Sequence, residues 1–145
     1  MTDDRTEALL QTVVRREARS LLQYVSEAFP WETAEERGAV AQLQQAAAEE
    51  RDAVAALTRA MQRKRLTPPY LGAFPQEFTT INFVSLDHLL PQLVDAQRRA
   101  ITALERDRDA LEDPDLRAGL DKVLEMKRRH LKTLESLAAK PQAAA

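Results

Sequence analysis

Apolar residues recur at intervals of three and four through most of this 145-residue chain, which contains only three glycines. This spacing places the apolar side chains on one face of an α-helix, whereas a half-buried strand would alternate apolar and polar residues. The periodicity therefore predicts an all-α protein. Because 145 residues with 44% hydrophobic content suffice for one core, we expect a single domain over residues 1–140 and a loose tail over 141–145.

The apolar stripes and the residues typical of helix ends predict four helices, at about 6–29, 33–65, 85–111 and 114–137. The stripe of the first helix includes Leu21 and Tyr24, and the helix is expected to end at Pro30-Trp31. At the start of the second helix, Thr33-Ala34-Glu35-Glu36 fits a capping box. Ser85 is the expected start of the third helix. Asp113 is expected to cap the fourth, with Pro114 at its first position.

The lengths of the connections predict how these helices are arranged. About three residues join the first two helices and about two join the last two, so each pair should form an antiparallel hairpin. Between the hairpins, residues 66–84 reach about 60 Å when extended, enough to return along a helix of about 40 Å. A four-helix bundle of two antiparallel hairpins with one long crossover is the ferritin-like arrangement.

The crossover contains four large apolar residues, Phe74, Phe78, Ile81 and Phe83. We expect them to form an apolar strap that packs on the bundle. The alternative is a contact between two copies of the chain, and a homodimer is the expected assembly.

Composition removes several classes of function. Without cysteine there is no disulfide, thiolate metal site or cysteine nucleophile. The acidic start lacks the basic and apolar regions of a secretory signal, and no apolar stretch approaches the roughly 18 residues of a membrane span. The net charge is -2, and pairs such as Arg15-Arg16 and Arg98-Arg99 alternate with acids, which is typical of solvated faces. We therefore expect a cytoplasmic protein that binds neither nucleic acid nor membrane.

One set of polar residues falls inside the predicted core. An offset of 80 residues superimposes the stripes of the first and third helices and places Glu17 on Gln97. An offset of 77 does the same for the second and fourth helices, placing Glu50 on Lys127 and Ala53 on His130. At about 100° per residue these positions lie within the apolar stripes. Four helices are thus predicted to direct polar groups to one level of the core.

This constellation resembles the ligand pattern of ferritin-like and rubrerythrin-like di-iron carboxylate bundles, in which two helices each give one Glu and two each give Glu-x-x-His. Glu17, Glu50 and His130 match that pattern, within segments such as Glu17-Ala-Arg-Ser-Leu-Leu-Gln-Tyr24 and Met126-Lys-Arg-Arg-His130. Ala53 stands at a His position, and Gln97 and Lys127 stand at Glu positions. The resemblance covers about residues 6–137 and implies a degenerate metal site.

Three interpretations of these positions remain open. In the first, Glu17, Glu50, Gln97, Lys127 and His130 form a buried cluster without metal or other cofactor, because the Lys127 ammonium replaces the metal. In the second, iron or another divalent metal binds Glu17, Glu50 and His130. In the third, the register is one residue off and Glu49 or Asp52 faces the core instead.

The first two interpretations imply different functions. The first favours a non-catalytic structural or interaction protein, without catalytic residues. The second favours a metal-binding protein or a metal-dependent oxidoreductase of the ferritin-like type. A carrier of a small molecule, with the polar cluster at the bottom of a pocket between helices, is the further alternative, and the sequence leaves the ligand unknown.

Overall fold

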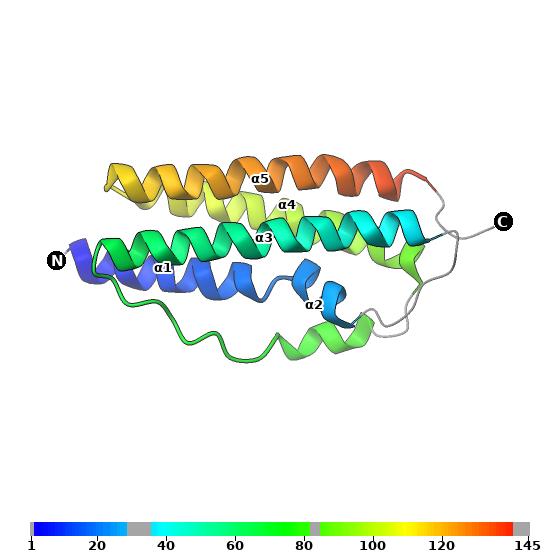
Figure 1. Ribbon diagram of the computed structural model, residues 1–145, viewed down its shortest axis with the longest axis horizontal. Helices are drawn as coiled ribbons and strands as arrows, with labels where there is room; N and C mark the ends of the chain where they lie inside the picture. The colour runs from blue at the N-terminus through cyan, green and yellow to red at the C-terminus, as the bar shows by residue number, and fades with distance from the viewer. Residues whose placement is uncertain (1, 29–35, 82–84, 141–145) are drawn as a thin grey trace.

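The computed structural model describes residues 2–28, 36–81 and 85–140, and every regular element in these ranges is a helix (Figure 1). The elements are α1 (Thr2–Ala18), α2 (Leu21–Ala28), α3 (Arg37–Arg63), the 3₁₀-helix η1 (Gln76–Ile81), α4 (Leu86–Ala110) and α5 (Pro114–Ala138). They lie side by side as a bundle, in which α5 packs most extensively against α4 and α3. The predicted all-α class is confirmed. None of the described helices has the length and apolar composition that crossing a membrane requires.

Two predicted helix starts are confirmed by their capping contacts. The Ser85 hydroxyl accepts a hydrogen bond from the His88 backbone N–H at 3.3 Å. The Asp113 carboxylate accepts from the next two free N–H groups of α5, at 2.9 and 3.1 Å, with Pro114 at the first helical position. These caps satisfy N–H groups that have no partner within the helix. The predicted capping box at Thr33 and helix end at Pro30 lie in residues 29–35, outside the described residues, as does the tail 141–145.

The prediction of one continuous helix from Thr6 to Phe29 was wrong, because the helix is interrupted at Arg19–Ser20. The Ser20 hydroxyl accepts a hydrogen bond from the Gln23 backbone N–H at 3.2 Å and so begins α2 as a new helix. A side chain that caps the backbone in this way competes with continuation of the helix. The break also changes which residues of α2 face the core. Leu22, Gln23 and Val25 are buried, whereas the predicted core residues Leu21 and Tyr24 are only half-buried.

Helix α3 ends in a Schellman motif formed by Lys64, Arg65 and Leu66. The Leu66 N–H donates to the Met61 carbonyl and the Arg65 N–H to the Gln62 carbonyl, both at 2.9 Å. Arg65 adopts a left-handed conformation with φ of 61°, a position that glycine usually occupies. This turn starts the described part of the long connection, residues 66–81, which we call the strap.

The strap runs along α1 (Figure 1). It is held by polar side chains spaced four residues apart, three on α1 and the fourth, Arg19, directly after its end. The Glu7 carboxylate accepts from the Thr67 N–H at 2.8 Å, and Gln11 donates to the Thr67 carbonyl at 2.8 Å. Arg15 and Arg19 donate to the carbonyls of Tyr70 and Gly72, at 3.2 and 2.8 Å. Residues four apart share one helix face, so α1 supplies the partners that the irregular strap backbone lacks.

The two phenylalanines of the strap, Phe74 and Phe78, pack on α2. The rings of Phe74 and Phe78 lie 5.5 and 5.7 Å from the ring of Tyr24, and the Arg19 guanidinium stacks over Phe74 at 5.0 Å. Phe74 and Phe78 are half-buried, as expected for a strap packed on the bundle. The side chains of Ile81 and Phe83, which the same prediction included, lie outside the described residues.

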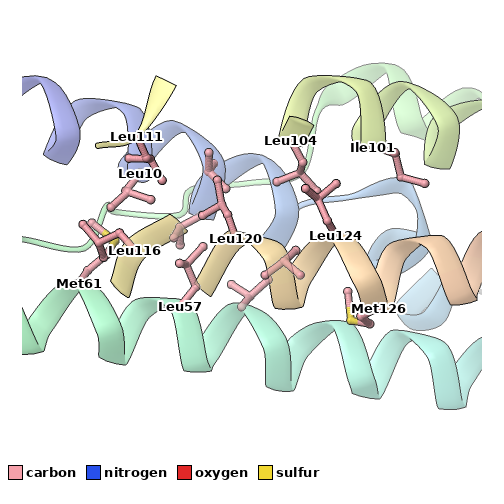
Figure 2. Close-up of a cluster of buried hydrophobic side chains, with 14 residues drawn as sticks. Leu10, Leu57, Met61, Ile101, Leu104, Leu111, Leu116, Leu120, Leu124 and Met126 are labelled. Atoms are coloured by element: carbon pink, nitrogen blue, oxygen red, sulfur yellow. The ribbon is translucent and has the colours of Figure 1, made fainter. Parts of the chain in front are cut away.

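The hydrophobic core consists of two clusters, one toward each end of the bundle. The first cluster contains Leu10 of α1, Leu57 of α3, Leu104 of α4 and Leu120 of α5 (Figure 2). The second contains residues from the opposite ends of α3, α4 and α5 and from α2, such as Leu22, Leu43, Leu90, Leu134 and Leu137. On each long helix, the polar positions singled out above fall between the two sets in sequence. A polar layer therefore divides the core.

Candidate functional site

The structure buries all five residues that the helix offsets brought together. Glu50 is fully buried, Glu17 and Lys127 are 1% exposed, and Gln97 and His130 are 4% exposed. Charged side chains are rarely buried to this degree unless they are paired. The contacts of this layer therefore decide what it can do.

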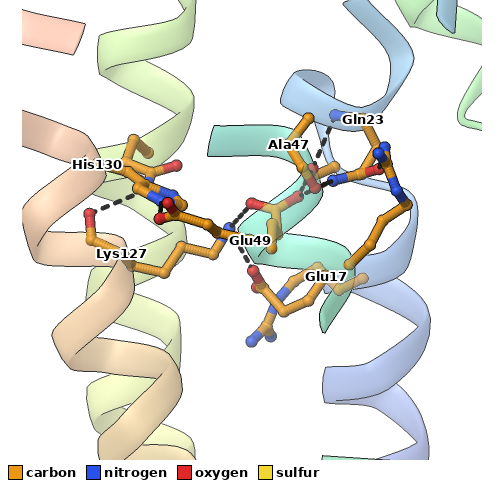
Figure 3. A network of polar contacts seen from close by, with 11 residues as sticks. Glu17, Gln23, Ala47, Glu49, Lys127 and His130 are labelled. Atoms are coloured by element: carbon orange, nitrogen blue, oxygen red, sulfur yellow. Dashed lines mark hydrogen bonds and ion pairs between the residues drawn. The ribbon is translucent and has the colours of Figure 1, made fainter. Parts of the chain in front are cut away.

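Lys127 on α5 is the centre of the layer (Figure 3). Its Nζ lies 2.6 Å from Glu17 Oε1 on α1 and 2.6 Å from Glu50 Oε2 on α3. The contact with Glu50 is a hydrogen bond as well as an ion pair, and the contact with Glu17 is an ion pair of the same length. One ammonium group thus joins two carboxylates from different helices, and all three side chains are almost entirely buried.

The second oxygen of Glu50 is bound by residues at the helix break. Ser20 donates its hydroxyl to Glu50 Oε1, and Gln23 Nε2 donates to the same atom at 3.1 Å. Gln23 also donates to the Ala47 carbonyl at 2.8 Å and accepts from Arg51 at 3.1 Å. The break between α1 and α2 therefore supplies the donors that a buried carboxylate needs.

Sequence reasoning missed Ser20 and Gln23 because it treated the first helix as continuous. The signal was present, since Ser20-Leu-Leu-Gln23 fits the capping-box pattern of Ser or Thr followed three residues later by Glu or Gln. In the structure, Gln23 does not complete the reciprocal box through its side chain, which instead turns toward Glu50.

The second oxygen of Glu17 connects the layer to the surface. Arg16 Nε lies 3.1 Å from Glu17 Oε2, and another nitrogen of the same guanidinium lies 3.0 Å from Asp107 on α4. The Arg16 side chain is 33% exposed. The two buried carboxylates are thus opposed by the buried Lys127 and by the partly exposed Arg16, which Glu17 shares with Asp107.

Lys127 remains charged in this environment. Complete burial by itself lowers the pKa of an ammonium group, but the charges of Glu50 and Glu17 and their contacts outweigh burial and raise the pKa of Lys127 to about 12. The ammonium therefore holds its proton at neutral pH. It cannot act there as a base or a nucleophile, since either role requires the neutral amine.

Gln97 and His130 lie in the layer but do not contact the carboxylates of Glu17 and Glu50. Gln97 Nε2 donates to the backbone carbonyl of Lys127 at 2.9 Å, linking α4 to α5. His130 Nε2 lies 2.8 Å from Glu49 Oε1, and its Nδ1 is buried without a partner among the described residues. The hydrogen bond with His130, followed by one from Gln45, lowers the pKa of Glu49. Glu49 is 41% exposed, so this pair lies at the edge of the bundle.

The arrangement does not suit the metal site considered on Glu17, Glu50 and His130. The Lys127 ammonium lies between the two carboxylates, and an ammonium there would repel a cation. His130 contacts Glu49 instead of sharing a ligand position with Glu17 and Glu50. No three His, Asp or Glu side chains in the described part of the chain are grouped so as to hold a metal ion.

Comparisons of the chain with protein-family models, with curated proteins and with solved structures found no match.

Proposed function

We propose that the chain is a ferritin-like bundle, with two antiparallel hairpins joined by a crossover, in which an internal ion pair stands in place of a di-iron centre. Its role is that of a non-catalytic structural or interaction protein, acting as a homodimer. The observation that carries the proposal is the position of Lys127 Nζ, 2.6 Å from carboxylates on α1 and α3. A metal shared by these helices would need the same place.

The charge balance of the layer supports this role. A di-iron site needs several anionic ligands, and its metal ions neutralise carboxylates that would otherwise repel one another. Here Lys127 and Arg16 oppose Glu17 and Glu50. These contacts reduce the repulsion between the two carboxylates, which is the role that the metal ions would otherwise have. A charged lysine with a raised pKa and two paired carboxylates also offers no obvious acid, base or nucleophile for catalysis.

Restoring the missing ligands tests the proposal. The triple variant Ala53→His, Gln97→Glu and Lys127→Glu would supply four carboxylates and two imidazoles with Glu17, Glu50 and His130. Ala53 packs against the core, so the substituted side chain would enter the layer. We expect the parent to bind no stoichiometric Co(II). The triple variant should bind two ions, with a rise in its melting temperature when metal is added.

The matched control keeps Lys127 and changes only Ala53→His and Gln97→Glu. This variant should not bind two ions, because the ammonium still lies between Glu17 and Glu50. Visible absorption and calorimetry measure the stoichiometry, and circular dichroism shows whether each variant is folded. A folded triple variant without metal would contradict the proposed relationship to di-iron bundles. Stoichiometric metal in the parent would favour the alternative metal-binding function.

A further inference from the structure

A pocket of about 720 Å³ lies on one side of the bundle, between α1, the start of α2, α4 and the strap. Sites for small molecules commonly have volumes of about 300–1,000 Å³. The strap closes one side of the pocket with residues that include Leu71, Pro75 and Phe78. Because Arg15 on α1 and Arg19 directly after it hold the strap through hydrogen bonds, the pocket is part of the folded structure.

The walls of this pocket are mainly apolar. They include Leu21 and Leu22 from α2, Leu93 from α4, and Phe78 from the strap. Alanines at positions 96, 100 and 103 line the side formed by α4. Small side chains on this face leave space that leucine would fill. An apolar molecule can therefore remove both its own surface and these walls from water.

The charges around the pocket are strongly unbalanced, although the whole chain has a net charge of -2. The lining contains one carboxylate, from Glu17, against the cations Arg15, Arg16, Arg19, Arg99 and Lys127. Lys127 and Arg16 are paired with carboxylates, as described above. Arg15 and Arg19 donate only to backbone carbonyls, and Arg99 makes no ion pair with any described residue. The unpaired positive charge belongs to these three arginines.

We propose that this pocket binds a small amphipathic anion, a molecule with an apolar body and one acidic group. Arg15 on α1 and Arg99 on α4 both line the pocket and are exposed, so the acidic group would bind at its mouth. The buried inner residues Leu22 and Leu93 would contact the apolar body. A carboxylate or a phosphate provides the chemistry that guanidinium groups recognise.

The buried layer favours this orientation of the ligand. Glu17 and Lys127 line the inner end of the pocket but are already paired with each other. An acidic group placed there would approach the Glu17 carboxylate, whereas at the mouth it meets arginines without acidic partners. The pocket and its arginines do not depend on the origin of Lys127. Binding of an amphipathic anion can therefore be tested independently of the proposed loss of a metal site.

Binding of dodecanoate, measured by calorimetry below the concentration at which it forms micelles, tests the inference. We expect saturable binding at one site per chain. Dodecanol should bind at least about tenfold more weakly, since it has the same apolar body without the charge. Dodecyl phosphate should also bind, and inorganic phosphate alone should not, because the apolar walls supply much of the affinity. Equal binding of dodecanol and dodecanoate, or uptake without saturation, would overturn the proposal.

Two variants test whether dodecanoate binds in this pocket. Arg99→Glu should weaken dodecanoate binding roughly tenfold, and the fold should tolerate it because Arg99 forms no ion pair with any of the described residues. The matched control is Arg63→Glu, an exposed arginine on α3 that does not line the pocket. It should bind like the parent. Ala100→Trp should fill the pocket and abolish binding while the melting temperature shows that the protein is folded. Unchanged binding in Arg99→Glu and in folded Ala100→Trp would contradict the assignment.

Discussion

Lys127 has a charge that the core tolerates only because two carboxylates contact it. Its ammonium group lies 2.6 Å from both Glu17 and Glu50, and the three side chains are at least 98% buried. Removing a charge from water costs several kcal/mol, and only close pairing with satisfied hydrogen bonds offsets that cost. The donors from Ser20 and Gln23 are therefore as necessary to Glu50 as the ion pair itself.

The substitution Lys127→Met should lower the free energy of unfolding by about 3–5 kcal/mol, because it leaves two buried carboxylates without their shared partner. Methionine has a similar size, so the loss would come from charge and not from a cavity. The matched control is Lys122→Met, at an exposed position on the same helix, which should change stability by less than about 0.5 kcal/mol. Urea unfolding measures both.

Adding Glu50→Leu to Lys127→Met should recover much of the loss, because the remaining Glu17 carboxylate still has Arg16 as a partner. If the single variant unfolded at the same urea concentration as the parent, Lys127 would have to be solvated, and the layer would not be the ion-pair cluster described here.

Among the elements, the end of α3 carries a conformational strain that the sequence does not relieve. Arg65 has φ of 61°, and this conformation costs a residue with a Cβ atom roughly 1–2 kcal/mol more than it costs glycine. The turn persists because Leu66 packs against the core and the strap must leave the helix in this direction. Arg65 itself is exposed and contributes no described side-chain contact to the turn.

Replacing Arg65 with glycine should therefore stabilise the protein by about 0.5–1 kcal/mol, the relief of strain less the greater flexibility of glycine in the unfolded chain. The control Gln62→Gly, at an exposed position within α3, should destabilise it by a similar amount, because helical residues have no such strain. Melting temperatures of the two variants should shift in opposite directions. A loss of stability in Arg65→Gly would show that the turn is not strained.

At the scale of the whole molecule, the polar layer ties α1, α3, α4 and α5 together between two hydrophobic clusters. An apolar stripe allows neighbouring helices to slide by a turn, because one leucine can replace another. A charged layer opposes such a slide, since displacement would separate Lys127 from both carboxylates. The layer thereby gives the bundle one register, a role known for buried polar residues in other helical assemblies.

Because of the same ion pairs, the stability of the whole bundle should decrease at alkaline pH. Because the pKa of Lys127 is raised from 10.5 to about 12, its contribution is fully present below pH 10.5 and is lost as the pH rises toward 12. The loss should be on the order of 2 kcal/mol. Urea unfolding between pH 9 and 12 measures it. The double variant Lys127→Met, Glu50→Leu should lose less over this range, and an identical loss would assign the effect to other groups.

The sequence by itself determined the all-α class, the two helices that begin after Ser85 and Asp113, and the burial of Glu17, Glu50, Gln97, Lys127 and His130. Periodicity and the caps at Ser85 and Asp113 are local properties, and helical geometry relates any two positions on one helix. For this reason the offsets could align Glu17 with Gln97 and Glu50 with Lys127 before any contact was known. The all-α class followed from the same local signals.

Only the tertiary structure decided which of these groups meet. The break at Ser20 is favourable because Glu50, 30 residues away, needs donors, and this demand does not appear in the first helix alone. His130 contacts Glu49 instead of the ligand positions, and Arg15 and Arg19 bind the strap, since these choices depend on how the helices pack. The pocket beside α1 exists for the same reason. Contacts between distant segments depend on distances in space, which the spacing of residues along one helix does not contain.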